Sequence, residues 1–168
     1  MAKSSDQPRL VIWGACVIIA YIEDAEGKTE RLQPFIDDAE AGELLILVPE
    51  TSVVEVLSLR KHWRAGGDAA GLRDMYLEFL QEPFIVRVPL HADLAEQASE
   101  IATTAPTKIK GVPDAVLIAL AVANQAVLHT YDGETKPGPL QLDGLIGDPP
   151  VQIRKPVYGQ DTLFAGNV

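Results

Sequence analysis

Three acidic residues, Glu55, Asp114 and Asp132, lie just past the ends of apolar runs or loops in this sequence. Glu55 lies in PETSVVEVL after the run LLILV, Asp114 follows GVP at the start of an apolar segment, and Asp132 follows AVLHTY. Carboxylates gathered within a few ångströms repel one another unless a cation holds them. Oxygen ligands of this kind select Mg²⁺ or Mn²⁺, and such an ion activates water and neutralises charge on a phosphate. Together, the three acids would therefore suit hydrolysis of a phosphate ester.

Local structure offers a second explanation for each acid. Ser52 and Glu55 have the spacing of a capping box, in which the two side chains satisfy backbone N–H groups at a helix start. An acid at the position of Asp114 is favoured by the helix dipole. Asp132 and Gly133 form a common turn pair. Each of these explanations is sufficient for one residue, so the choice depends on whether the acids meet in space.

The elements that must position the acids alternate along the chain. Apolar, β-branched runs predict strands at 10–13, 44–48, 84–88, 126–131 and 151–154. Helical patterns occur at 16–22, 29–41, 52–63, 68–81, 92–103 and 114–124. Strands separated by helices pair in parallel through right-handed crossovers. We therefore predict a three-layer α/β/α sandwich around a parallel sheet of about five strands, which would bring the three acids to one edge.

The predicted domain spans residues 1–156, with residues 157–168 as a C-terminal tail. The helix DAVLIALAVAN at 114–124 is apolar almost all round, so it should lie against the sheet or in a subunit interface. The segment 133–150 is rich in glycine and proline and is long for a loop, so it either borders a site or is mobile. The tail shows no clear periodicity and is expected to be disordered or to dock on a partner.

Composition limits the classes of function. The chain has 168 residues, is 47% hydrophobic and carries a net charge of −10, which argues against a general nucleic-acid coat protein. A local basic stretch still exists at Arg60, Lys61 and Arg64, either as a solvated helix end or as a phosphate contact. The N-terminal residues lack the apolar core of a signal peptide, and no apolar run is long enough for a membrane helix. We therefore expect a cytoplasmic protein with no membrane partner.

The order of four motifs resembles the PIN domain, a metal-dependent nuclease fold. The motifs are GACVIIAYI, VPETSVVEVL, GVPDAVLIALAVA and LHTYDGE, and the resemblance extends from Leu10 to about Asp132. It assigns the family's acidic positions to Glu55, Asp114 and Asp132, and a hydroxyl position to Thr130. Gly14 stands where the family has its first aspartate, a principal metal ligand.

The resemblance implies a ribonuclease that uses Mg²⁺ or Mn²⁺, as in the toxins of bacterial toxin-antitoxin pairs. Such toxins often form homodimers and bind a small antitoxin protein. The missing acid at Gly14 implies impaired metal binding and impaired cleavage of RNA. The alternative is a catalytically inactive PIN-like module that binds RNA, an antitoxin or a second copy of itself.

Gly14 itself has three explanations. In the first, the chain is a pseudo-nuclease that naturally lacks the aspartate. In the second, the aspartate was replaced so that a toxic ribonuclease could be produced. In the third, the glycine serves only a tight or left-handed turn between strand and helix. Cys16, two residues later, is expected to be a small buried hydrophobic residue rather than a ligand.

Overall fold

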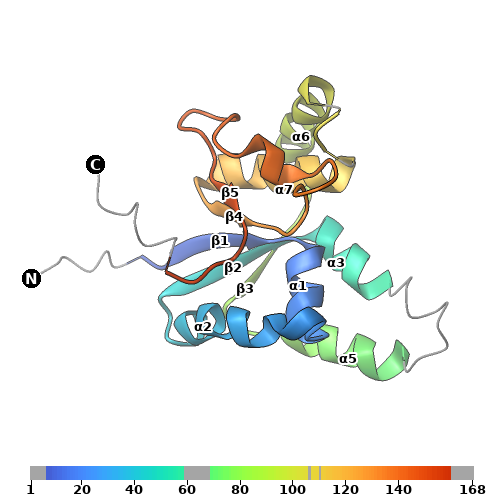
Figure 1. The fold of residues 1–168 in the computed structure, drawn as a ribbon, viewed down its shortest axis with the longest axis vertical. Helices are drawn as coiled ribbons and strands as arrows, with labels where there is room; N and C mark the ends of the chain where they lie inside the picture. The colour runs from blue at the N-terminus through green and yellow to red at the C-terminus, as the bar shows by residue number, and fades with distance from the viewer. Residues whose placement is uncertain (1–6, 59–68, 106, 110, 160–168) are drawn as a thin grey trace, which may run out of the picture.

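The computed structural model describes residues 7–58, 69–105, 107–109 and 111–159. Its centre is a five-stranded parallel sheet in the order β3-β2-β1-β4-β5 (Figure 1). The strands are β1 (Arg9–Trp13), β2 (Leu44–Pro49), β3 (Ile85–Val88), β4 (Val127–His129) and β5 (Ile153–Arg154). Val11 of β1 aligns with Ile46 on one side and with Val127 on the other. All five predicted strands are confirmed, and β4 and β5 are shorter than expected.

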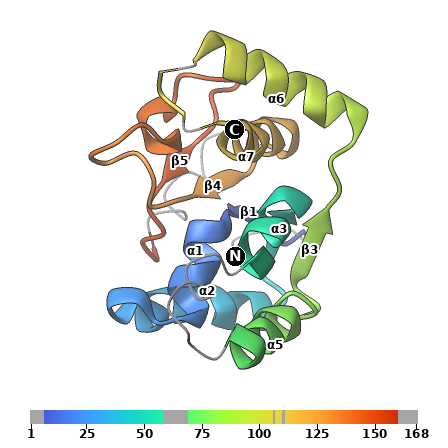
Figure 2. The same ribbon diagram turned by 90° about the vertical axis from the view of Figure 1, so that its right-hand side faces the viewer.

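Helices cover both faces of the sheet, as the two views in Figures 1 and 2 show. One layer contains α1 (Ala15–Ile22), α2 (Lys28–Glu40), α3 (Glu50–Ser58) and α5 (Ala69–Phe79), with a short 3₁₀ turn η1 (Ala25–Gly27) before α2. The other layer contains α6 (Ala92–Thr104), α7 (Val112–Asn124) and the 3₁₀ turn η2 (Pro139–Leu142). The predicted α/β/α sandwich is therefore confirmed. No helix in the described part of the chain is long and apolar enough to cross a membrane.

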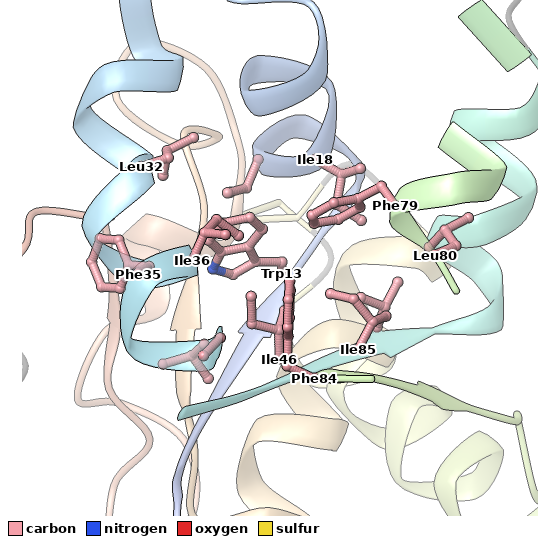
Figure 3. Packing of buried hydrophobic residues seen from close by; sticks show 14 of the residues in the cluster. Trp13, Ile18, Leu32, Phe35, Ile36, Ile46, Phe79, Leu80, Phe84 and Ile85 are labelled. Atoms are coloured by element: carbon pink, nitrogen blue, oxygen red, sulfur yellow. The ribbon is translucent and has the colours of Figure 1, made fainter. Parts of the chain in front are cut away.

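The core beneath α1, α2 and α5 is built around Trp13 (Figure 3). Its indole ring stacks on Phe79, with ring centroids 6.3 Å apart, and meets Phe35 edge-on at 6.5 Å. The indole Nε1–H donates a hydrogen bond to Nδ1 of the buried His129, at 3.1 Å. This contact ties the end of β1 to the end of β4, so it fixes the two strand ends that border the candidate site.

The opposite core lies between the sheet and α7. Residues 115–121 of this helix are all buried, which follows from its nearly continuous apolar sequence. Leu94, Ala98 and Ile101 of α6 cover the outer side of the same cluster. Helix α7 therefore packs against the sheet on one side and against α6 on the other. This agrees with the prediction that the apolar helix lies against the sheet.

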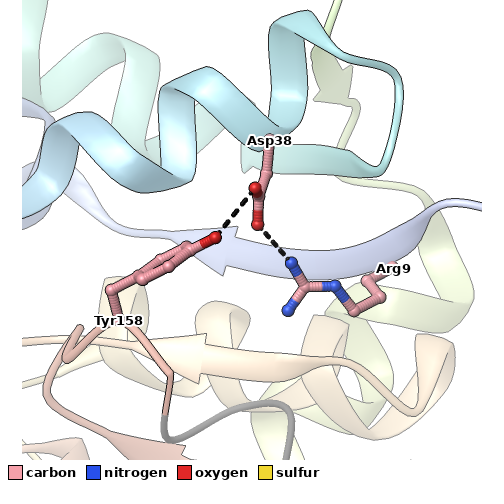
Figure 4. Close-up of polar contacts among 3 residues, drawn as sticks. All are labelled: Arg9, Asp38 and Tyr158. Carbon is pink, nitrogen blue, oxygen red and sulfur yellow. Dashed lines mark hydrogen bonds and ion pairs between the residues drawn. The ribbon is translucent and has the colours of Figure 1, made fainter.

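The segment after β5 docks on α2. Tyr158 donates a hydrogen bond from its hydroxyl to Oδ1 of Asp38 at 2.9 Å (Figure 4). The Tyr158 ring also meets the Phe35 ring edge-on. The other carboxylate oxygen of Asp38 accepts a bond from Arg9 at 2.5 Å. The first residues of the predicted tail thus contact the domain, while residues 160–168 lie outside the described part.

Candidate active site

Gly14 joins β1 to α1 without any unusual backbone angle. Its φ of −79° and ψ of 173° are extended values that every residue type adopts. Its carbonyl accepts hydrogen bonds from Val17 N–H at 3.1 Å and Ile18 N–H at 3.3 Å, which starts the helix. The interpretation of Gly14 as a left-handed turn residue is therefore wrong, because nothing in its backbone requires glycine.

The space that a side chain at position 14 would occupy is partly filled by α7. A Cβ atom on Gly14 would lie 2.9 Å from Cδ1 of Leu117 and 3.5 Å from its Cδ2. Leu117 is 5% exposed and belongs to the second core. Glycine at this position therefore lets the N-terminal half of α7 pack closely against the end of β1.

Asp114 shares this part of α7. It lies in the first turn of the helix and is 8% exposed. Leu117 follows it by three residues, a spacing that puts both on neighbouring positions of one helix face. The contact between Leu117 and Gly14 therefore brings the turn that carries Asp114 to the same edge of the sheet as Gly14.

Asp132 is held in a tight turn after β4. Its backbone N–H donates to the Thr130 hydroxyl at 3.0 Å, and its carbonyl accepts a bond from Leu140 N–H at 3.1 Å. Gly133 has a φ of +119°, and a Cβ there would lie 2.9 Å from the Gly138 carbonyl oxygen. The predicted turn at Asp132 and Gly133 thus exists. Thr130, which is 1% exposed, stabilises the turn because its hydroxyl accepts the hydrogen bond from the Asp132 N–H.

Cys16 also belongs to this site, although the sequence suggested only a small buried hydrophobic residue. It packs against the core, but its Sγ also lies 3.5 Å from the Thr130 hydroxyl. Burial raises the pKa of the Cys16 thiol above its ordinary value, and the charge of Asp132 raises it further, while the bond with Thr130 lowers it. The Cys16 thiol, the Thr130 hydroxyl and the Asp132 carboxylate are therefore neighbours. The only sequence feature that could have placed Cys16 at the site is its position two residues after Gly14.

Glu55 occupies the second turn of α3, and its side chain is exposed. The capping-box prediction for this residue is wrong, because α3 begins at Glu50, directly after β2, and Ser52 is already inside the helix. The Ser52 hydroxyl is buried and has no hydrogen-bond partner among the described residues. Glu50 has a separate structural role, since it accepts two hydrogen bonds from Arg87 at 2.9 and 2.7 Å.

The sheet order explains how these parts meet. β2, β1 and β4 are neighbouring parallel strands, so the residues that follow them lie at one edge. Cys16, Thr130 and Asp132 are gathered there by direct contacts. Gly14 precedes Cys16 by two residues, and Leu117 lies beside Gly14, which brings Asp114 to the same edge. Within the described residues, no group of three or more histidine, cysteine, aspartate or glutamate side chains is placed to hold a metal ion. A metal site formed by Glu55, Asp114 and Asp132 therefore remains a prediction.

The predicted RNA contacts at Arg60, Lys61 and Arg64 fall outside the described residues.

Comparison with known proteins agrees with this architecture. The solved structures with a similar fold include the following two. VapC20 of Mycobacterium tuberculosis, described as a sarcin–ricin loop cleaving toxin, has a TM-score of 0.59 at 13% identity, covering 74% of this chain and 91% of its own. VapBC2 of Rickettsia felis, solved bound to a DNA fragment from its promoter, has a TM-score of 0.58 at 15% identity, covering 87% of this chain and 97% of its own.

No curated protein matches the chain significantly. The model of the PIN domain family matches residues 15–136, which is more than half of the sequence and includes Glu55, Asp114, Thr130 and Asp132. The chain therefore belongs to the PIN domain family.

Proposed function

We propose that this chain is a metal-dependent ribonuclease of the PIN type whose cation site is incomplete at position 14. The observation that supports this most directly is the backbone of Gly14. Its extended angles would accept an aspartate unchanged, at the strand-to-helix junction where the family has its first acid. The resemblance assigns Asp114, Thr130 and Asp132 to the same site.

The ion suited to the remaining carboxylates of Glu55, Asp114 and Asp132 is Mg²⁺ or Mn²⁺. When bound, such an ion supplies a polarised water and neutralises charge on a phosphodiester. The described residues do not fit a complete site, because no three acids are placed together and Leu117 lies where a side chain at position 14 would extend. We therefore expect weak binding of the ion and slow or absent cleavage of RNA by this chain.

The two similar structures support a proposal for the class of substrate and the class of partner of this chain. One is described as cleaving the sarcin–ricin loop, and the other was solved as a VapBC2 assembly. By analogy, we propose RNA phosphodiesters as the substrate and a small antitoxin protein as a partner, with a homodimer in the cytoplasm. Arg60, Lys61 and Arg64 remain our predicted contacts with RNA.

A second function, a catalytically inactive binding module, is favoured by the same incomplete site. The fold would then be kept for binding RNA, an antitoxin or a second copy of the chain. This alternative differs from the first in one respect, because restoring an acid at position 14 would not produce a nuclease.

The test is a ribonuclease time course on the chain and on Gly14→Asp, each with Mg²⁺, Mn²⁺ or EDTA. The proposal expects divalent-dependent cleavage that is recovered by the substitution. Asp114→Asn in the restored background is the control and should abolish the gain. No activity in the chain, in Gly14→Asp or in Gly14→Asp with Leu117→Val, which relieves the close contact at position 14, would favour the binding module. Equal activity in the chain and in Gly14→Asp that EDTA does not inhibit would contradict the role of position 14.

A further inference from the structure

A lysine is fixed over an aromatic ring at the edge of the candidate site. The Lys28 ammonium lies 4.5 Å from the centre of the Tyr131 ring. Tyr131 stands between Thr130 and Asp132, so the ring belongs to the same strand end as the site. The Lys28 side chain is 22% exposed, which leaves part of it open to solvent.

Helix stability does not account for this cation. Lys28 is the first residue of α2, and a positive charge at a helix N-terminus is unfavourable because the helix dipole is positive there. Its ion pair with Glu26, at 3.1 Å, involves a glutamate side chain that is 83% exposed. Exposed pairs of this kind contribute little to stability. The cation–π contact, which holds the ammonium beside the site, is therefore the more informative interaction.

Other positive charges border the same strand end. Burial, and after it the charge of Cys16, raises the pKa of Tyr131, while the charge of Arg31, in the first turn of α2, acts against this and lowers it. Lys155, after β5, pairs with Glu134 in the loop that follows Asp132. Lys28, Arg31 and Lys155 thus border this edge from two segments, with Glu26 and Glu134 as the ion-pair partners of the two lysines.

We propose that Lys28, held in place by the ring of Tyr131, contacts the phosphate backbone of a single-stranded RNA beside the candidate site, with Arg31 as a second cation. The inference rests on the proposed function in taking RNA as the ligand. Phosphate contacts fix the position of a nucleic acid without reading its sequence. In a protein with an excess of acids, a few local cations must supply that attraction.

The test measures binding of a fluorescent, mixed-sequence, single-stranded RNA by polarisation, in EDTA so that cleavage does not interfere. Lys28→Met should weaken binding about three- to tenfold at low salt and reduce the slope of log K against log salt by about 0.7, the value for one contact to a single strand. Lys108→Met is the comparison variant, because Lys108 is an exposed lysine in the segment between α6 and α7 and takes no part in the contact between α2 and Tyr131.

Variants of Tyr131 test whether Lys28 acts because the ring holds it in place or only because it is positively charged. Tyr131→Phe keeps the ring and should bind RNA like the unchanged protein. Tyr131→Leu removes the ring and should weaken binding, and adding it to Lys28→Met should cause little further loss, because both changes remove the same contact. Circular dichroism on each variant establishes that the fold is intact.

The outcomes distinguish this inference from the proposed function. Equal losses for Lys28→Met and Lys108→Met, or no loss for Lys28→Met in a protein that binds RNA, would overturn the inference alone. No binding of RNA at low salt by the unchanged chain would overturn both. Binding that depends on Lys28, with no cleavage after restoration of position 14, would support the inference while contradicting the nuclease.

Discussion

The effect of Gly14→Asp on the free energy of unfolding shows how strongly a side chain in the candidate site affects packing of the core around Leu117. The backbone angles accept the new residue, and substitution of glycine at compatible angles stabilises by about 0.4 to 1 kcal/mol through the unfolded chain. Aspartate is also a slightly better N-cap than glycine, by a few tenths of a kcal/mol. Against this, the Cβ atom would come within 2.9 Å of Leu117, and overpacking a core costs about 1 to 3 kcal/mol. We expect a net loss of about 1 kcal/mol in the free energy of unfolding.

A double-mutant cycle isolates the steric part of that loss. Leu117→Val removes both Cδ atoms, which are the nearest atoms to the added Cβ, and alone should cost about 1 kcal/mol for the lost methylene group and its space. In Gly14→Asp with Leu117→Val the clash is gone. The double variant should therefore be more stable than the sum of the two single losses by about 1 kcal/mol, as expected for residues in contact.

Divalent ions supply a readout independent of cleavage. If an acid at position 14 completes a cation site, Mg²⁺ at ten times its Kd should stabilise the Gly14→Asp proteins by about 1.4 kcal/mol and leave the unchanged chain nearly unaffected. Urea unfolding with Mg²⁺ and with EDTA measures this difference. Additive losses in the cycle would refute the contact with Leu117, and the absence of any Mg²⁺ effect in both aspartate variants would refute the cation site.

Two further predictions concern the turn and the thiol beside Asp132. Cys16 is the only cysteine, and because burial and then the Asp132 charge raise its pKa, its alkylation rate should rise with pH to a midpoint above that of the urea-unfolded chain. Asp132→Asn should lower that midpoint, and an unchanged midpoint would contradict the proximity of the two groups. Gly133→Ala should lower the free energy of unfolding by more than the roughly 1 kcal/mol expected for Gly144→Ala, because both have positive φ but only Gly133 faces backbone atoms at 2.9 Å. Urea titrations of both variants compare them, and equal losses would show that the close approach is unimportant.

The sheet was predictable because its three central strands, β1, β2 and β4, are mostly buried. β1, β2 and β4 are runs of apolar and mostly β-branched or leucine residues, and such runs keep their character when helices cover both sides. The start of α3 was not predicted, because the capping pattern at Ser52 was matched by chance inside a helix that follows Pro49 without a loop. A local pattern cannot show that a strand leads directly into a helix.

The polar part of the site depended on contacts that no local pattern contains. Cys16 and Thr130 are separated by 114 positions, and the turn between Thr130 and Asp132 brings the carboxylate beside the thiol. The motif order placed the residues on neighbouring strand ends but carried no distances. The same limit applied to Lys28, because its partner Tyr131 is distant from it in the sequence.

Gly14 is best explained by packing and chemistry together. Its backbone has no need of glycine, so turn geometry does not account for the residue. What glycine does permit is the close approach of Leu117, a core residue of α7 that lies one helical turn beyond Asp114. An acid at position 14 and a leucine at this distance compete for the same space. We therefore expect that full recovery of a cation site requires a change at both positions, so that the single aspartate variant should bind Mg²⁺ more weakly than the variant that also carries Leu117→Val.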